Sequence, residues 1–316
     1  MRPGDDEAVP LSETLGLLAK VKAYLASMED ADGADWLAEA RKLGAGAVGD
    51  LERHAEYQPD TLLQRWMKNV VQQVEQLTGS RAMGHLNEIW RADVWQPYAR
   101  KLRGRYPLDR SSSIDANLQE FGDFFGPGGQ IDTFVDEHLQ DIVDTRRWTV
   151  RSRGRVIPIS PSTLAQLRRA DEIKRNFFAS GGETPAVHLW IKLLTMDRGV
   201  STATLTLDGQ VVQYDTGPVV ERELWWPGPQ GQRGASIRLE PPSAVGATND
   251  IVRDGAWAWF RLLDQAQITP RAGQPEHFNV TFTVGGRSVS QELRASSTDN
   301  PYRSSALREF NCPERL

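Results

Sequence analysis

The strongest constraint on the fold of this chain of 316 residues is a change in the period of its apolar residues near residue 185. Before that point, apolar residues recur at the three- and four-residue spacing of amphipathic helices. After it, they alternate with polar residues, which is typical of half-buried strands. We therefore predict an α+β protein with an N-terminal helical bundle over residues 1–180 and a C-terminal antiparallel β-sandwich over residues 181–316.

The helical half carries one apolar stripe that we expect to face the core of the bundle. It consists of Leu62, Leu63, Trp66, Val70, Val74 and Leu77. Turn-forming residues predict breaks between helices at residues 28–35, 59–60, 78–80, 103–113 and 126–130. A later helix is predicted to begin at Ser160, with Pro161 in its first turn. The basic segment at residues 147–161 is a candidate hinge.

The second half contains about seven predicted strands, which favour an antiparallel sandwich of two sheets. In residues 278–284, apolar side chains alternate with Asn and Thr, so one face of this strand is expected to be buried. Asp208 with Gly209, and Gly285 with Gly286, fit two-residue hairpin turns, because these residues tolerate positive φ.

A short inserted helix is predicted where residues 253–266 interrupt the strands. Its aromatic residues recur at helical spacing, and Asp254 stands where an N-cap is expected. Large aromatics at this spacing usually fill a core. We assign Trp226, Trp257, Phe260 and Phe282 to the structural core of the sandwich.

Composition excludes several classes of protein. The formal net charge is -5, so the chain does not have the excess of Lys and Arg over Asp and Glu that binding to nucleic acid requires. No stretch approaches the roughly 20 apolar residues of a membrane-spanning helix. The lone Cys312 forms no intramolecular disulfide, and we expect it to be a buried apolar residue.

Motifs of catalysis and of metal binding are absent from the sequence. No two of the five histidines have the spacing of a helical metal site, and no Gly-x-Ser-x-Gly occurs. His138 lies among Asp136, Glu137 and Asp141, which is compatible with a metal or acid–base site but fits a solvated acidic helix face better. The acidic residues 30–35 lack the register of a calcium loop. We expect no catalytic residues, no metal and no cofactor, and hence no enzyme.

The adjacent residues Trp225 and Trp226 precede a loop built from Pro and Gly. Successive side chains of a strand point to opposite faces, so we expect Trp226 to pack inward and Trp225 to point outward with Glu221 and Glu223. An exposed Trp flanked by charge and a rigid loop is typical of an interface anchor. A surface aromatic covered by its own loop is the alternative.

Five stretches of the sequence, in the same order, resemble a known family. They are FGDFFGPGGQIDTFVDEHLQDIVD (121–144), FFASGGETPAVHLWIKL (177–193), LDGQVVQYDTGPVVERELWWPG (207–228), DGAWAWFRLLDQA (254–266) and STDNPYRSSALREFNCPERL (297–316). They are similar to the C-terminal periplasmic region of the IcmF/TssM proteins of bacterial type VI secretion systems. The resemblance covers most of residues 100–316, and the first hundred residues are consistent with the helical part of that region.

The resemblance implies a structural role. Proteins of this family are inner-membrane proteins whose periplasmic part contacts the outer-membrane lipoprotein TssJ and builds, with TssL, the envelope-spanning membrane complex. The chain is then expected to be a periplasmic ectodomain, starting at an artificial Met1, that acts as a scaffold and is homo-oligomeric in the assembled complex.

For partner binding we select the Pro-Gly loop and its surroundings. The candidates are Trp225, Gln230 and Arg233, with Arg253 and residues 297–303 as weaker choices. The competing hypothesis is a sandwich that binds carbohydrate, such as peptidoglycan, by stacking exposed tryptophans on sugar rings.

Overall fold

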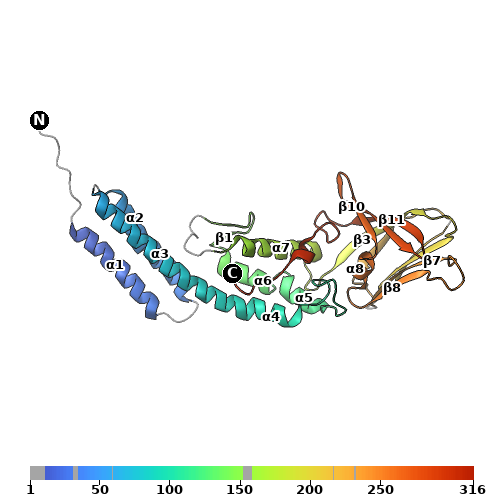
Figure 1. The fold of residues 1–316 in the computed structure, drawn as a ribbon, viewed down its shortest axis with the longest axis horizontal. Helices are drawn as coiled ribbons and strands as arrows, with labels where there is room; N and C mark the ends of the chain where they lie inside the picture. Colours follow the sequence, from blue (N-terminus) through green and yellow to red (C-terminus); the bar gives the residue numbers. More distant parts are fainter. Residues whose placement is uncertain (1–10, 31–34, 59, 152–158, 216, 231–232) are drawn as a thin grey trace, which may run out of the picture.

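The computed structural model describes residues 11–30, 35–58, 60–151, 159–215, 217–230 and 233–316. The molecule is elongated: a helical arm leads into a compact helical region, and two β layers form the opposite end (Figure 1). The predicted order of helices followed by antiparallel sheets is confirmed.

Three long helices build the arm, in which α2 packs against both α1 and α3. Their bounds are α1 (Leu11–Asp30), α2 (Asp35–Glu56) and α3 (Thr61–Trp90). The compact region follows with the π-helix η1 (Arg91–Trp95), α4 (Gln96–Lys101), α5 (Leu118–Phe125), α6 (Gln130–Phe134), the π-helix η2 (Val135–Leu139), the short strands β1 (Val143–Asp144) and β2 (Thr149–Val150), and α7 (Pro161–Phe177). The Thr14 hydroxyl contacts the His54 ring at 2.9 Å and so links α1 to α2.

The apolar stripe predicted for α3 is wrong in part. Leu62, Trp66 and Leu77 are 74%, 48% and 64% exposed, whereas the buried face of α3 carries Met67 and Val71. The helix holds two overlapping apolar stripes, and hydrophobic spacing alone does not say which of them faces its neighbours.

The break predicted at residues 78–80 is also wrong, because α3 continues to Trp90. The Thr78 hydroxyl donates to the Val74 carbonyl at 2.9 Å, one turn earlier, and this bond is compatible with a continuous helix. The other helix starts agree with prediction: Asp60 caps α3, and Ser160 caps α7 through the Thr163 amide at 3.0 Å. Residues 31–34 of the acidic turn and residues 152–158 of the candidate hinge lie outside the described residues.

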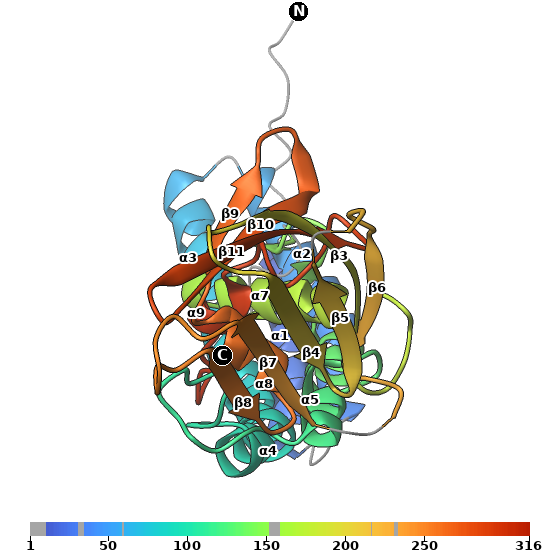
Figure 2. The same cartoon turned by 90° about the vertical axis from the view of Figure 1, so that its right-hand side faces the viewer.

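Two antiparallel sheets form the other half and face each other (Figure 2). The five-stranded sheet has the order β6 (Arg222–Trp226), β3 (Val187–Met196), β11 (Arg287–Ala295), β10 (Gln274–Val284) and β9 (Gln267–Arg271). The four-stranded sheet has the order β5 (Gln210–Tyr214), β4 (Thr202–Leu207), β7 (Gly234–Glu240) and β8 (Asp250–Asp254). Both expected hairpin turns are present, with φ of 48° and 84° at Asp208 and Gly209, and 57° and 78° at Gly285 and Gly286.

The inserted helix is shorter than predicted. Helix α8 spans Ala258–Leu263, and Asp254 ends β8 instead of capping the helix. Strands β8 and β9 were not predicted from the sequence. Both are edge strands, and β9 is largely exposed, so the alternation that reveals a half-buried strand is weak in it.

An aromatic cluster joins the sandwich to the helices. The Trp257 ring lies 5.0 Å from Phe121, 5.9 Å from Phe177 and 4.9 Å from Trp226, measured between ring centroids. Two of these rings come from the helical region and two from the sandwich. Phe282 is fully buried in the sandwich. Helices and sheets therefore share one continuous core.

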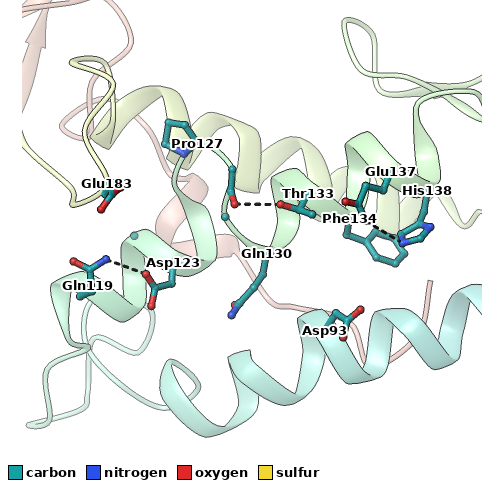
Figure 3. Close-up of a pocket in the computed structure, with 13 residues that line it drawn as sticks. Asp93, Gln119, Asp123, Pro127, Gln130, Thr133, Phe134, Glu137, His138 and Glu183 are labelled. Atoms are coloured by element: carbon teal, nitrogen blue, oxygen red, sulfur yellow. Dashed lines mark hydrogen bonds and ion pairs between the residues drawn. The ribbon is translucent and has the colours of Figure 1, made fainter.

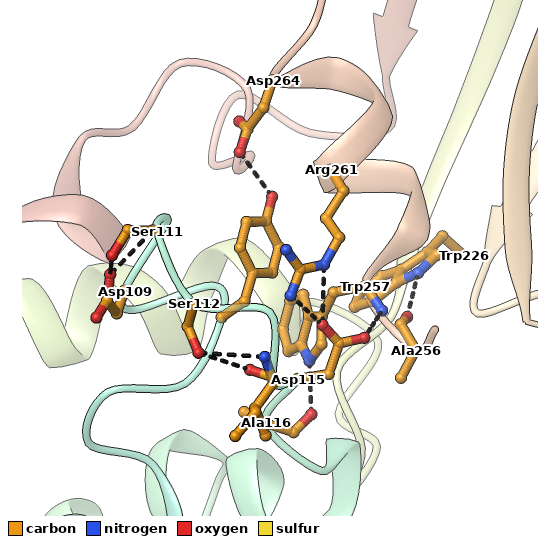
Figure 4. Close-up of polar contacts among 12 residues, drawn as sticks. Asp109, Ser111, Ser112, Asp115, Ala116, Trp226, Ala256, Trp257, Arg261 and Asp264 are labelled. Atoms are coloured by element: carbon orange, nitrogen blue, oxygen red, sulfur yellow. Dashed lines mark hydrogen bonds and ion pairs between the residues drawn. The ribbon is translucent and has the colours of Figure 1, made fainter. Parts of the chain in front are cut away.

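Asp115 completes this junction (Figure 4). Its carboxylate accepts from Arg261 at 2.6 and 3.0 Å and from the Trp257 backbone amide at 3.2 Å. The Trp257 indole donates to the Ala116 carbonyl at 2.8 Å. Gly255 has a φ of 101°, and a Cβ there would meet the Asp115 carboxylate at 2.3 Å, so the approach requires glycine.

The C-terminal segment returns from the sandwich to the helices. It contains α9 (Ala306–Glu309). The Trp90 indole donates to the Pro313 carbonyl at 2.7 Å, and the Phe310 ring packs 5.0 Å from Phe125. Cys312 is 4% exposed, and burial raises the pKa of its thiol. This segment is a second link between the two halves.

Replacing Asp115 by Ala is expected to destabilise the whole chain. Arg261 and Asp115 are 18% and 19% exposed, so the change leaves a largely buried guanidinium and a backbone amide without their partner. We expect a loss of about 3 kcal/mol in the free energy of unfolding, measured by urea denaturation. Asp109→Ala, in the same loop, is the control and should change little, because the Asp109 carboxylate bonds locally, to Ser111 and the Ser112 backbone. Equal losses of stability for Asp115→Ala and Asp109→Ala would contradict the role of Asp115 at the junction.

Replacing Gln291 by Met is expected to stabilise the sandwich. Gln291 is fully buried on β11, and neither of its amide atoms has a hydrogen-bond partner in the described part of the protein. Methionine keeps the length of the side chain and removes the desolvated amide. We expect a gain of about 1–2 kcal/mol in urea denaturation. Gln213→Met, at an exposed position of β5, should leave stability unchanged. Reduced stability of Gln291→Met would show that the amide is satisfied in solution.

Candidate functional site

The two tryptophans of β6 point to opposite faces of the sheet, in agreement with the alternation of a strand. Trp226 is 1% exposed, and its indole donates to the Ala256 carbonyl at 3.1 Å. Trp225 is 44% exposed on the outer face. It stacks on His188 of β3 with 3.7 Å between ring centroids and 4° between planes. Because the two residues are direct partners in the strand register, the sheet itself positions this stack.

The stack continues across the sheet. The His188 ring lies 4.1 Å from Trp190, and the Arg294 guanidinium lies 3.9 Å above the Trp190 ring. Trp190 and Arg294 are again direct partners, between β3 and β11. We call Trp225, His188, Trp190 and Arg294 the ring ladder. It forms a row of three aromatic rings that ends in a guanidinium group on the exterior of the five-stranded sheet.

Two carboxylates hold the ring ladder in place. Glu223 lies 2.6 Å from the His188 Nε2 atom, and Glu221 accepts from Arg294 at 2.8 and 3.2 Å. The hydrogen bond from Arg294 lowers the pKa of Glu221, and the same bond raises the pKa of Arg294. The ladder residues therefore have their side chains fixed before any partner arrives.

A side chain from the other sheet fixes the backbone of Trp225. Gln210 of β5 accepts from the Trp225 amide at 3.0 Å and donates to the Trp225 carbonyl at 2.7 Å. The amide of Gln210 thus satisfies the backbone groups that Trp225, on an edge strand, would otherwise leave unpaired.

The Pro-Gly loop crosses from β6 to β7, and Asp208 anchors both of its ends. The buried Asp208 carboxylate accepts from the Gly228 and Gly234 amides, each at 2.9 Å. Within this loop Gln230 and Arg233 are exposed, and residues 231 and 232 lie outside the described residues.

Arg253 lies close to the far end of this loop. It is half-buried on β8, where it is paired with Ala235, and its guanidinium donates to the Val252 carbonyl at 2.7 Å. Gln230, Arg233 and Arg253 therefore gather at one end of the sandwich, while Trp225 lies beside them at the edge of the other sheet.

Sequence reasoning did not identify the other members of the ring ladder. Alternation alone places His188 and Trp190 on the outer face of their strand. Their contact with Trp225 and Arg294 depends on how β3 aligns with β6 and β11, and no short-range signal reports that alignment. The roles of Gln210 and Asp208 likewise depend on the packing of one sheet against the other.

The geometry of the ring ladder suits protein recognition better than sugar stacking. A carbohydrate platform needs aromatic rings that are exposed and close to coplanar. Here His188 covers one face of Trp225, Arg294 covers a face of Trp190, and the His188 and Trp190 planes differ by 48°. A rigid indole beside fixed charges is the kind of group that anchors interfaces.

A cavity of about 520 Å³ lies in the helical region, between η1, α5, α6 and η2 (Figure 3). Acidic side chains, including Asp93, Asp123 and Glu137, line it. The Thr133 hydroxyl donates to the Gly128 carbonyl at 3.1 Å, and the His138 ring packs 5.0 Å from Phe134. The His138 Nε2 atom also lies 3.8 Å from the Glu137 carboxylate, so both groups already have contacts within the protein.

Within the described ranges, no three or more His, Cys, Asp or Glu side chains are grouped so that they would hold a metal ion. Among the described helices, none combines the length and the apolar character needed to cross a membrane.

Two family models match the chain. Residues 81–183 match the helical domain of the type VI secretion protein IcmF, and residues 189–297 match the C2-like domain of the same protein. Among curated proteins, the type VI secretion system component TssM1 of Pseudomonas aeruginosa is 36% identical over 316 residues. This match covers 99% of the chain but only 28% of the relative, so the chain spans about 28% of that protein's length.

Solved structures share the fold. The C-terminal domain of the type VI secretion protein TssM from EAEC aligns with a TM-score of 0.65 at 23% identity, covering 74% of this chain and 98% of that one. A chain of a type VI secretion system membrane core complex aligns with a TM-score of 0.69 at 22% identity, covering 94% and 60%. A chain of a type VI membrane complex aligns with a TM-score of 0.75 at 20% identity, covering 99% and 68%.

Proposed function

The chain belongs to the IcmF/TssM family of type VI secretion proteins, as its C-terminal region, and from this premise we propose that it is a non-enzymatic scaffold of the secretion membrane complex. In this proposal it lies in the periplasm as part of an inner-membrane protein, and its β-sandwich binds the outer-membrane lipoprotein TssJ. The likeness to chains of type VI membrane complexes supports a structural role.

The fixed position of the exposed Trp225 ring is the observation on which we base the choice of docking surface. Trp225 exposes a large apolar ring whose position is fixed by His188 on one side and by Gln210 through the backbone. A ring that is already held loses little conformational freedom on binding, so most of the free energy of its burial is available for affinity. The neighbouring Pro-Gly loop adds Gln230 and Arg233 as exposed polar groups, and Arg253 lies next to its end.

The division of the chain fits this role. We propose that residues 1–180 form the helical unit that connects to the rest of the complex, and that residues 181–316 form the docking unit. The match to the helical family model ends at residue 183 and the match to the C2-like model begins at residue 189, which supports a boundary close to residue 180. TssL and further copies of the chain are the other partners that we propose for the assembled complex.

The experiment is a binding titration of the intact chain with the purified soluble part of its TssJ, followed by calorimetry. We expect Trp225→Ala to weaken binding by about 2 kcal/mol, because it removes a central aromatic anchor. Arg233→Ala should weaken binding by a smaller amount, since it removes a polar contact near the rim of the interface. Both side chains are exposed, so the fold should be retained.

Matched controls come from the helical arm. Trp66 on α3 is 48% exposed, close to the value for Trp225, and Arg65 beside it is exposed as well. Trp66→Ala and Arg65→Ala should leave the affinity for TssJ unchanged. If Trp225→Ala and Arg233→Ala have no effect while TssJ still binds, the docking surface lies elsewhere. If wild-type chain and TssJ do not associate, the proposed partner is wrong.

A further inference from the structure

A second cavity lies where the sandwich meets the helical region, and we call it the junction cleft. It has a volume of about 300 Å³. Its walls come from the loop after α4, from α8, from β9 and from the C-terminal segment. They comprise Tyr106, Pro107, Arg110, Phe260, Leu263, Asp264, Ile268, Pro270, Pro301, Tyr302, Arg303, Ser304, Leu307 and Arg308. Since β9 and β6 are opposite edges of the five-stranded sheet, the cleft is separate from the surface around Trp225.

The floor of the junction cleft is aromatic and held in place. The Tyr302 ring stacks on Phe260, with 6.4 Å between centroids, and the Trp259 indole donates to the Tyr302 hydroxyl at 3.1 Å. The Tyr106 hydroxyl donates to Asp264 at 2.9 Å, while the Arg261 guanidinium lies 3.9 Å above the Tyr106 ring. Burial raises the pKa of Tyr106, so its hydroxyl keeps the proton that it donates. The cleft is therefore preformed.

The rim of the junction cleft carries excess positive charge. Asp264 is the acidic residue in its lining, and it already pairs with Arg110 as well as Tyr106. Arg303 and Arg308 are exposed, and within the described residues neither of their guanidinium groups has a carboxylate at ion-pair distance. Glu309, which follows Arg308, is bonded to Arg169 at 2.8 Å, and its pKa is lowered by hydrogen bonds from Ser305 and Arg169 and, to a smaller extent, by the charge of Arg308. Arg303 and the exposed end of Arg308 face the cleft.

We propose that the junction cleft binds an acidic segment of a partner polypeptide, with a large apolar side chain in the cleft and neighbouring carboxylates on Arg303 and Arg308. The charge of the rim selects the acidic residues, because arginine pairs with carboxylates in a bidentate geometry. The apolar floor selects the anchor, because burying an aromatic or aliphatic side chain against Phe260, Leu263 and Tyr302 removes apolar surface from water.

A small anion alone would use only part of the junction cleft. A phosphate group would pair with the rim arginines, but the apolar floor of Phe260, Leu263, Ile268 and Leu307 offers it no hydrogen bond. The volume is at the lower limit for small-molecule pockets, of about 300 Å³, and is sufficient for one large side chain. A peptide meets both requirements, since its anchor and its charges are different groups.

The test is a fluorescence anisotropy titration of the intact chain with defined peptides. The probe is a fluorescein-labelled Gly/Ser peptide with one phenylalanine flanked by glutamates. Matched peptides replace the phenylalanine by alanine or the glutamates by lysines. We expect saturable binding of the probe, and weaker binding of both matched peptides. The double variant Arg303→Glu with Arg308→Glu should weaken binding of the probe by at least about fivefold.

The control is the double variant Arg65→Glu with Arg198→Glu, which makes the same change in net charge at exposed positions away from the cleft. It should bind the probe like the wild type. The proposal is overturned if the probe does not bind saturably, if the lysine peptide binds equally well, or if both double variants weaken binding to the same extent. It is also overturned if sedimentation shows that the Arg303 and Arg308 changes dissociate a self-associated form, because the occupant is then a second copy of the chain.

Discussion

The contact of Asp115 with Arg261 and the Trp257 backbone is the interaction on which the rest of the molecule depends. It ties the loop after α4 to the short helix α8, and α8 carries the aromatic rings that fill the junction. Burial of these rings removes apolar surface from water, and that driving force is not directional. The carboxylate fixes the orientation of α8, so the sandwich is held at one position on the helices. Surfaces on the sandwich are therefore presented in a defined direction relative to the helical arm.

The C-terminal segment adds a second link between the sandwich and the helical region. After the last strand the chain returns to the helical region, where Pro313 accepts from Trp90 and Phe310 packs among aromatic rings. A force that pulls the two halves apart has to break this segment away from the helices as well as open the aromatic cluster. Two links of different kinds resist separation of the helical region from the sandwich better than a single linker does.

Local signals in the sequence were sufficient for the fold class, the hairpin turns, the caps of α3 and α7, and the opposite directions of Trp225 and Trp226. These features depend on neighbours within a few residues. The buried face of α3 was missed because Leu62 and Trp66 compete with Met67 and Val71 in the same helix, and only the position of α2 decides between them. The ring ladder and the junction cleft could not be predicted because they depend on contacts between residues far apart in the sequence. Arg294 meets Trp190 through strand register, and Tyr302 meets Phe260 through the return of the C-terminal segment.

The edges of the five-stranded sheet limit how any partner can bind. Strand addition is a common way to recruit a peptide, and it needs free backbone groups on an edge strand. On β6, Gln210 already occupies the amide and carbonyl of Trp225. On β9, Pro270 contributes no N–H group. Both edges are therefore poor templates for an added strand. Recognition by this sheet therefore has to use side chains, and the two proposed surfaces lie beside these two edges.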